Sequence, residues 1–255
     1  MSMFENIVDK YINFGNETIG KLLVEYMQAN TVTESEVAYL ARRLAESGVL
    51  MTLHEANRCV DIPSTGGHSS LSTILCPLFI VALGYSVPKL AIPGRPAGGI
   101  DIMAQIPGYH ISFEQKEIIG ILEQCSYAHF LATANFTPRD GELYIYRKKN
   151  DAINMPDLAI ASLLSKKVAV GLRRVGLEIR VALHGNFGNS WDRARDNAQR
   201  FIRVSKLLNI DAVCFLTNGQ IPYQPYIGRG EALVALQNVL DDSCDEWLRK
   251  HAMLC

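Results

Sequence analysis

The stretch SLLSKK places a serine and a lysine, Ser162 and Lys166, four residues apart, and Arg147 stands upstream of them. Residues four apart are neighbours on a helix surface, so both side chains project from one face of the predicted helix. A hydroxyl beside two cations can bind a ring edge that presents acceptor, donor and acceptor in turn, as uracil and thymine do. On spacing alone, a surface helix with solvated lysines is the better explanation.

The stretch DIPSTGGHSS, residues 61–70, has the residue types of an anion-binding turn. Gly66 and Gly67 can adopt positive φ and bring backbone N–H groups close to a ligand at the start of the next helix, where the helix dipole favours negative charge. Ser64 and Thr65 add two hydroxyl groups. A tight turn with capping serines is an equally good interpretation.

A second glycine-rich loop, PGRPAGGID at residues 93–101, also follows a predicted strand. Because the ends of parallel strands share one edge of a sheet, Arg95 can reach a ligand held by the first loop. On its own residues, this loop is better interpreted as an ordinary glycine-rich connection between two elements.

The elements that position these loops change in character along the chain. Residues 1–57 predict three or four short helices, since apolar residues recur at the 3.6-residue period. Capping boxes are predicted at Thr33 with Glu36 and at Thr52 with Glu55.

From residue 58 onward, short β-like runs alternate with helices. Strands are predicted at residues 58–62, 87–92, 129–133, 176–184 and 211–217. Helices are predicted at residues 71–83, 114–124 and 191–208, with a further helical stretch at residues 137–171. This alternation predicts a largely parallel α/β sheet with loops at the strand ends.

The composition excludes several classes of protein. Lys and Arg number 25 and Asp and Glu 26, so no basic excess indicates nucleic-acid binding. Six scattered cysteines without a Cys-x-x-Cys pair favour a reduced, intracellular protein over a disulfide framework or a zinc site. The N-terminus lacks the apolar core of a signal peptide, and the apolar run at residues 74–83 is too short to cross a bilayer. We expect a soluble, cytoplasmic protein with no membrane, metal or cofactor partner.

The chain resembles the pyrimidine nucleoside phosphorylases, which include thymidine phosphorylase, in short stretches that occur in the same order: STGG, VPKLAIPGR, GGID, IPG, YIYR, IASLLSKKVAVGL and FLTN. The resemblance covers roughly residues 30–235. It implies a small all-α lobe, residues 1–57 and 137–171, and a larger mixed or parallel α/β lobe, residues 58–136 and 172–255, in a homodimer joined through the α lobe. The family continues beyond the last residue of this chain, so we expect a fold truncated at its C-terminus.

Members of the family cleave the C1′–N1 bond of a pyrimidine nucleoside with phosphate and release the free base. The resemblance implies that Tyr144, Arg147, Ser162 and Lys166 bind the pyrimidine base. The departing base carries negative charge on its exocyclic oxygens, so two fixed cations there stabilise the transition state preferentially. We therefore expect Arg147 and Lys166 to be catalytic, with a pyrimidine nucleoside or nucleotide as substrate and phosphate as a candidate second substrate.

The phosphate side of the resemblance is incomplete. The STGG residues 64–67, the STGG loop, are retained. Thr73 stands where the family has a further phosphate serine and can substitute for it, and Arg95 is a further candidate anion ligand. The departures from the family pattern are Ile62 for a lysine, Pro63 for a histidine, Ser69 and Ser70 for a glycine-aspartate pair, Pro93 for a serine and Ile100 for a threonine. Each charge-assisted hydrogen bond is worth about 1.5–3 kcal/mol, so we expect phosphate binding to be weakened by orders of magnitude unless Arg95 or His68 compensates.

We expect a glycosyl-transfer enzyme, a pentosyltransferase with an altered phosphate site that cleaves the N-glycosidic bond of a pyrimidine nucleoside or nucleotide. A phosphate-independent hydrolase with His68 as general base is an alternative, as is a non-catalytic pyrimidine-binding protein. A phosphoribosyl-transfer enzyme is less favoured, because the chain has no clear acidic pair for the magnesium ions of a diphosphate substrate.

Overall fold

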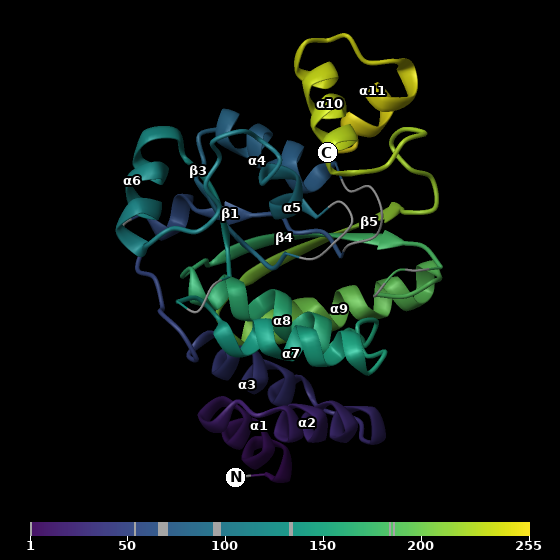
Figure 1. The fold of residues 1–255 in the computed structure, drawn as a ribbon. Helices are drawn as coiled ribbons and strands as arrows, with labels where there is room; N and C mark the ends of the chain where they lie inside the picture. Colours follow the sequence, from purple (N-terminus) through teal and green to yellow (C-terminus); the bar gives the residue numbers. More distant parts are fainter. Residues whose placement is uncertain are drawn as a thin grey trace.

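The computed structural model describes residues 2–53, 55–65, 71–93, 98–132, 135–183, 185 and 187–255 (Figure 1). The helices are α1 Met3–Phe14, α2 Glu17–Ala29, α3 Glu34–Ala45, α4 Ser72–Ala82, α5 Gly99–Met103, α6 Gln115–Cys125, α7 Pro138–Lys149, α8 Pro156–Ala169, α9 Trp191–Leu207, α10 Arg229–Leu240 and α11 Glu246–Ala252. The strands are β1 Val60–Asp61, β2 Val87–Ala91, β3 Tyr127–Leu131, β4 Arg174–Val181 and β5 Asp211–Asn218. All five predicted strands overlap an observed one.

The strands pair in parallel throughout the described part of the chain. One sheet has the order β1-β4-β5, and β2 pairs with β3 in a second. An isolated parallel bridge between Cys59 and Ser86 connects the two sheets. Parallel strands joined by helices confirm the predicted α/β fold.

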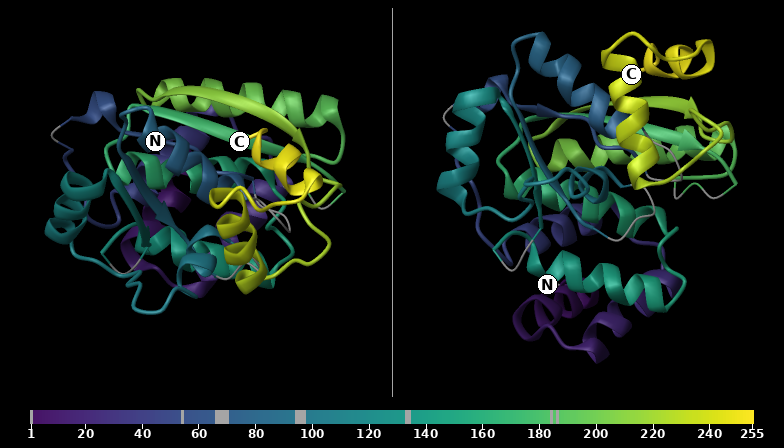
Figure 2. Two further views of the ribbon diagram at one scale, coloured as in Figure 1. Left: turned by 90° about the horizontal axis from the view of Figure 1, so that it is seen from above. Right: turned by 45° about the horizontal axis from the view of Figure 1, so that its top comes forward.

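Strand β4 divides the apolar interior into two sides. The side that packs against α3, α8 and α9 contains Val175, Leu177, Ile179 and Val181. Successive side chains of a strand point to opposite faces, so Glu178 and Arg180 face the other side. That side carries α4, whose Ser72 hydroxyl bonds to Glu178. Helices α8 and α9 thus cover one face of the sheet and α4 the opposite face (Figures 1 and 2).

The two predicted capping boxes have different outcomes. Thr33 and Glu36 form theirs at the start of α3. The box predicted at Thr52 and Glu55 is wrong, because neither residue lies in a helix and a short 3-10 turn without a side-chain cap follows. The N–H of the preceding Met51 donates to a carbonyl at the C-terminal end of α8, at 2.7 Å. A tertiary contact therefore ties this segment to the end of α8.

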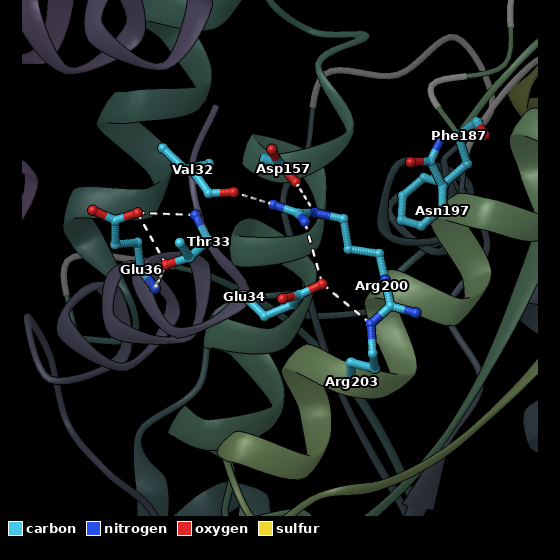
Figure 3. A network of polar contacts seen from close by, with 9 residues as sticks. All are labelled: Val32, Thr33, Glu34, Glu36, Asp157, Phe187, Asn197, Arg200 and Arg203. Carbon is cyan, nitrogen blue, oxygen red and sulfur yellow. Dashed lines mark hydrogen bonds and ion pairs between the residues drawn. The ribbon is translucent and has the colours of Figure 1, made fainter. Parts of the chain in front are cut away.

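Polar contacts join α9 to the N-terminal helices and to α8 (Figure 3). The carboxylate of Glu34 lies 3.4 Å from Arg200 and 3.1 Å from Arg203. Arg200 also binds the carboxylate of Asp157 and the carbonyl oxygen of Val32. One arginine thus connects the starts of α3 and α8 to the middle of α9.

A further apolar cluster joins α4 to the C-terminal helices, and the sequence did not predict it. It is formed by α4, α5, α10 and α11, with members such as Leu71, Ile74, Ile102, Ala232 and Leu248. Among the described residues, every helix is too short or too polar to cross a membrane.

Candidate functional site

The hairpin of α7 and α8 brings two of the predicted base-binding residues together with an aspartate. Pro156 stands in the first turn of α8, where its fixed φ suits the start of a helix. Ser162 Oγ and Lys166 Nζ lie 3.0 Å apart, and both groups donate to Oδ2 of Asp140 on α7. All three side chains are buried. One carboxylate therefore holds a hydroxyl and a cation in fixed positions.

The two adjacent lysines of α8 bind different carboxylates. Neighbouring residues on a helix point roughly 100° apart. Lys166 binds Asp140 on α7, whereas Lys167 Nζ donates to Oδ2 of Asp61 at the end of β1. The two lysines are only 6% and 2% exposed, so the interpretation as solvated surface lysines is wrong. Helix α8 connects the predicted base site to the start of the STGG loop.

Asp61 is fully buried between two ammonium groups. Its Oδ1 lies 2.7 Å from Nζ of Lys89 on β2, and the same Nζ lies 3.0 Å from the carbonyl oxygen of Ile62. Burial by itself would raise the pKa of Asp61, but Lys167 and Lys89 outweigh burial and hold the pKa below its ordinary value of 3.8. Two buried lysines thus share one carboxylate directly before the STGG loop.

Arg147, predicted to bind the base, is buried on α7. Its guanidinium donates to the carbonyl oxygens of Ala152 and Ile153, at 3.3 and 2.7 Å. These bonds hold the turn between α7 and α8 against α7. Asp140 and Arg147 are separated by about two helical turns and share one face of α7, with the half-buried Tyr144 between them in the sequence.

Ser64 and Thr65, the hydroxyl residues of the predicted anion loop, lie beside β4. Ser64 forms a parallel bridge with Glu178, and the N–H of Thr65 donates to the carbonyl of Glu178 at 2.9 Å. Thr65 Oγ1 accepts a hydrogen bond from the N–H of Arg180 at 3.0 Å. The first half of the loop is therefore fixed to β4, and the Thr65 hydroxyl keeps its proton for another acceptor.

Thr73, in the first turn of α4, lies near His129 of β3. A Cβ atom on Gly99 would come within 2.8 Å of Thr73 Oγ1 and 2.7 Å of His129 Cε1, so α5 approaches both groups only because residue 99 has no side chain. His129 Nδ1 lies 3.1 Å from the hydroxyl of Tyr127, and Nε2 has no partner among the described residues. Burial, assisted by the charge of Lys89, lowers the pKa of His129 to about 3, so the ring is neutral. The remaining predicted ligands, Gly66, Gly67, His68 and Arg95, lie outside the described residues.

Comparison of the sequence with known proteins finds nucleoside phosphorylases among its relatives. A pyrimidine-nucleoside phosphorylase of Staphylococcus epidermidis is 25% identical over 213 residues, which cover 81% of this chain and 49% of the relative. Thymidine phosphorylase of Mus musculus is 30% identical over 210 residues, 79% of this chain and 44% of the relative. The resemblance to the pyrimidine nucleoside phosphorylases is confirmed. The chain spans about half the length of these phosphorylases. No family model matches the chain.

Solved structures with a similar fold include a phosphoribosyltransferase. The structure of anthranilate phosphoribosyltransferase from Thermus thermophilus superposes with a TM-score of 0.62 and 15% identity, over 96% of this chain and 85% of the other. The chain therefore shares its fold with a pentosyltransferase, while its sequence relatives are phosphorylases.

Several polar residues of the site were missed by sequence reasoning. Lys89, His129, Glu178 and Arg180 all stand inside otherwise apolar strand runs, and such a residue in a buried parallel strand is an informative signal. Asp140 carries a weaker signal, since one acidic residue in the polar first turn of a helix is ordinary.

Proposed function

We propose that this chain is a pentosyltransferase that breaks the C1′–N1 bond of a pyrimidine nucleoside or nucleotide. The observation that supports this most strongly is the cluster of Ser162 and Lys166 on the carboxylate of Asp140. Ser162 and Lys166 stand at base-binding positions of the phosphorylase pattern. The ammonium group of Lys166 is already fixed and largely removed from water. It can therefore stabilise negative charge that develops on the base without further reorganisation.

In the proposed reaction, Ser162 and Lys166 bind one edge of the pyrimidine, with Tyr144 beside them. Arg147 contacts a base oxygen by exchanging one of its bonds to the α7–α8 turn. As the C1′–N1 bond breaks, its electron pair moves to the base, and Lys166 and Arg147 oppose the resulting negative charge. Asp140 acts as a positioning residue, since it contacts Lys166 rather than the substrate.

The acceptor is proposed to bind at the STGG loop, which follows Asp61, the partner of Lys167 on α8. Ser64 and Thr65 begin the loop, and Thr73 stands in the first turn of the following helix α4. Thr65 and Thr73 are buried. If the acceptor is phosphate, one of its oxygens forms the new bond to C1′ and the product is a sugar 1-phosphate. Gly66, Gly67 and Arg95 complete this proposed set.

A second reaction, hydrolysis without phosphate, is supported by the departures around the loop. The side chain of Ile62, which replaces the family lysine, lies against β4, where a Cβ atom on Gly176 would come within 2.9 Å of it. Position 62 therefore supplies no cation to an anion in the loop. Water then replaces phosphate at C1′, and His68 is the proposed general base. Binding of pyrimidine without chemistry is the third outcome to test.

One experiment separates these functions. Purified protein is incubated with uridine, thymidine, cytidine and their 5′-monophosphates, with and without phosphate, and free base is measured by chromatography. Release that requires phosphate identifies a phosphorylase, and release without phosphate identifies a hydrolase. Absence of release with measurable nucleoside binding identifies a binding protein. Absence of both release and binding contradicts the proposal.

The proposed lobes and dimer need a separate measurement. We propose an α lobe of residues 1–57 and 137–171 that joins two copies, and an α/β lobe formed by the rest. Met3, Phe14 and Leu22 on α1 and α2 are exposed apolar residues, which supports a contact at this end of the molecule. Sedimentation of the wild-type protein and of the Leu22→Asp variant tests the contact, and a monomeric wild type contradicts it.

A further inference from the structure

Arg180 carries a buried cation that the proposed mechanism does not use. Its side chain is only 3% exposed. Its Nε and Nη1 atoms have no hydrogen-bond partner within the described ranges. Charged groups that are removed from water are normally paired, because an isolated charge is poorly solvated in a protein interior. A buried guanidinium with unused donors therefore indicates that an anion binds there.

The charged and titratable neighbours of Arg180 do not satisfy these donors. The carboxylate of Glu178, on the same face of β4, accepts bonds from the hydroxyls of Ser72 and Thr217, and neither Nε nor Nη1 of Arg180 reaches it. Burial lowers the pKa of Arg180, and attraction to Glu178 opposes this. Burial also lowers the pKa of the nearby His251, and the charge of Arg180 lowers it further.

Space for a small ligand exists next to this residue. A cavity of about 140 Å³ is lined by polar residues such as Glu178, Thr217 and His251, and by apolar ones such as Ile62 and Phe215. Thr217, which lines the cavity, is the register partner of Arg180 across β4 and β5, and the charge of Arg180 acts on His251, another lining residue. A water molecule occupies about 30 Å³ of liquid volume, so the space suits a small polyatomic anion.

The backbone of Arg180 also connects it to the STGG loop. Its N–H binds the hydroxyl of Thr65, the last described residue before the two loop glycines. The residue at position 62, which is a lysine in the phosphorylase pattern, is an isoleucine in this chain. The lysines nearest to position 62, Lys89 and Lys167, are both paired with Asp61, whereas Arg180 on the neighbouring strand has unused donors.

We propose that Arg180 is the cationic ligand of a phosphoryl group bound beside Thr65 and replaces the lysine that is absent at position 62. This inference rests on the proposed function and adds to it the residue that recognises the anion. The phosphoryl group is either inorganic phosphate or the 5′-phosphate of a pyrimidine nucleotide, because both present the same oxygens to a guanidinium.

The test measures binding rather than turnover. Wild-type protein and the Arg180→Met and Arg180→Lys variants are titrated by calorimetry with inorganic phosphate and, separately, with uridine 5′-monophosphate, at constant ionic strength. The phosphoryl source is the ligand whose dissociation constant rises at least ten-fold in Arg180→Met. Arg180→Lys, which keeps the charge but loses the planar donors, is expected to show a smaller loss. Arg200→Met, which removes an arginine from the opposite face of the sheet, should bind as the wild type does.

A stability readout distinguishes a ligand-binding role from a structural one. Without ligand, Arg180→Met should melt at or above the wild-type temperature, since it removes a buried cation whose Nε and Nη1 have no partner among the described residues. Equal affinity of Arg180→Met and wild type for both probes overturns the proposal, as does a wild type that binds neither. The base-release assay is run on the same samples. Release by both proteins would leave the proposed function intact while the role of Arg180 fails.

Discussion

Nζ of Lys89 lies 3.0 Å from the carbonyl oxygen of Ile62. A lysine ammonium from β2 thus stands beside the position at which the phosphorylase pattern carries its own lysine. The same ammonium lies 2.7 Å from Asp61, which also binds Lys167. Lys89 is therefore part of a buried ion cluster that ties β1, β2 and α8 together beneath the STGG loop.

Asp61→Asn is expected to lower the free energy of unfolding by about 3–5 kcal/mol, because it leaves Lys89 and Lys167 buried without a counter-charge. Urea denaturation at neutral pH measures the change. The control is Asp192→Asn, whose side chain is 92% exposed, and a loss of less than about 1 kcal/mol is expected there. Similar losses in the two variants would show that the buried cluster contributes no more than a surface ion pair.

The same cluster predicts a dependence of stability on acid. Since the pKa of Asp61 is lower in the folded chain than its ordinary value of 3.8, its contribution is complete above that pH and is lost as the pH falls towards the folded value. The wild type should therefore lose stability more steeply than Asp61→Asn below about pH 4. Denaturation midpoints of both proteins between neutral and acid pH measure this, and parallel curves would contradict it.

Lys166→Met is expected to abolish base release and to weaken nucleoside binding at least ten-fold, because it removes a cation from the proposed base site. The single variant leaves Asp140 buried without its ion pair and is expected to lose stability. The double variant Asp140→Asn with Lys166→Met removes both charges and is expected to recover stability but not binding. Calorimetry with uridine and thermal melting give the two readouts.

The control for this series is Lys148→Met, an exposed lysine on α7. It should bind uridine and release base as the wild type does. Retention of full binding in the double variant would remove Lys166 from the base site.

The alternation of strands and helices was predictable because it depends on local patterns. The five strands and the helices α4, α6 and α9 each have an apolar run or a periodic face of their own. The helices α5, α10 and α11 were not predicted. Their buried residues pack mainly against one another and against α4, in a cluster that only the folded chain assembles.

The candidate site was predictable to a more limited extent. Helical spacing correctly placed Ser162 and Lys166 on one face, and the resemblance to the phosphorylases supplied the proposed ligand. The partners of these residues come from other elements: Asp140 from α7, and Asp61 from β1 for the adjacent Lys167. Pairing between distant segments leaves no periodic signal in a single sequence.

Arg200→Ala is expected to lower the free energy of unfolding by about 1–3 kcal/mol, because it removes charge-assisted bonds to Glu34, Asp157 and the Val32 carbonyl. Arg203→Ala is the matched control on the same helix. Its side chain is 54% exposed and shares Glu34, so a loss of less than about 1 kcal/mol is expected. Chemical denaturation of both variants measures the difference, and a larger loss for Arg203→Ala would contradict it.

His129 predicts a second acid-dependent loss of stability, in a higher pH range than that of Asp61. Burial, with the charges of Lys89 and Lys167, lowers its pKa from 6.5 to about 3, while Asp61 acts in the opposite direction. Between these values the unfolded chain binds a proton that the folded chain does not, so stability falls as the pH is lowered from 6.5 towards 3. The slope approaches about 1.4 kcal/mol per pH unit.

His129→Gln keeps a polar side chain at this position but cannot take up the proton. The difference in unfolding free energy between the wild type and this variant should therefore change by about 2 kcal/mol between pH 6.5 and pH 4.5. The control is His110→Gln, at an exposed position, which should follow the wild-type curve. Since His251 also has a lowered pKa and remains in every variant, it contributes equally to all three curves. A pH-independent difference between wild type and His129→Gln would mean that the folded protein accepts a proton on His129 as readily as the unfolded chain does.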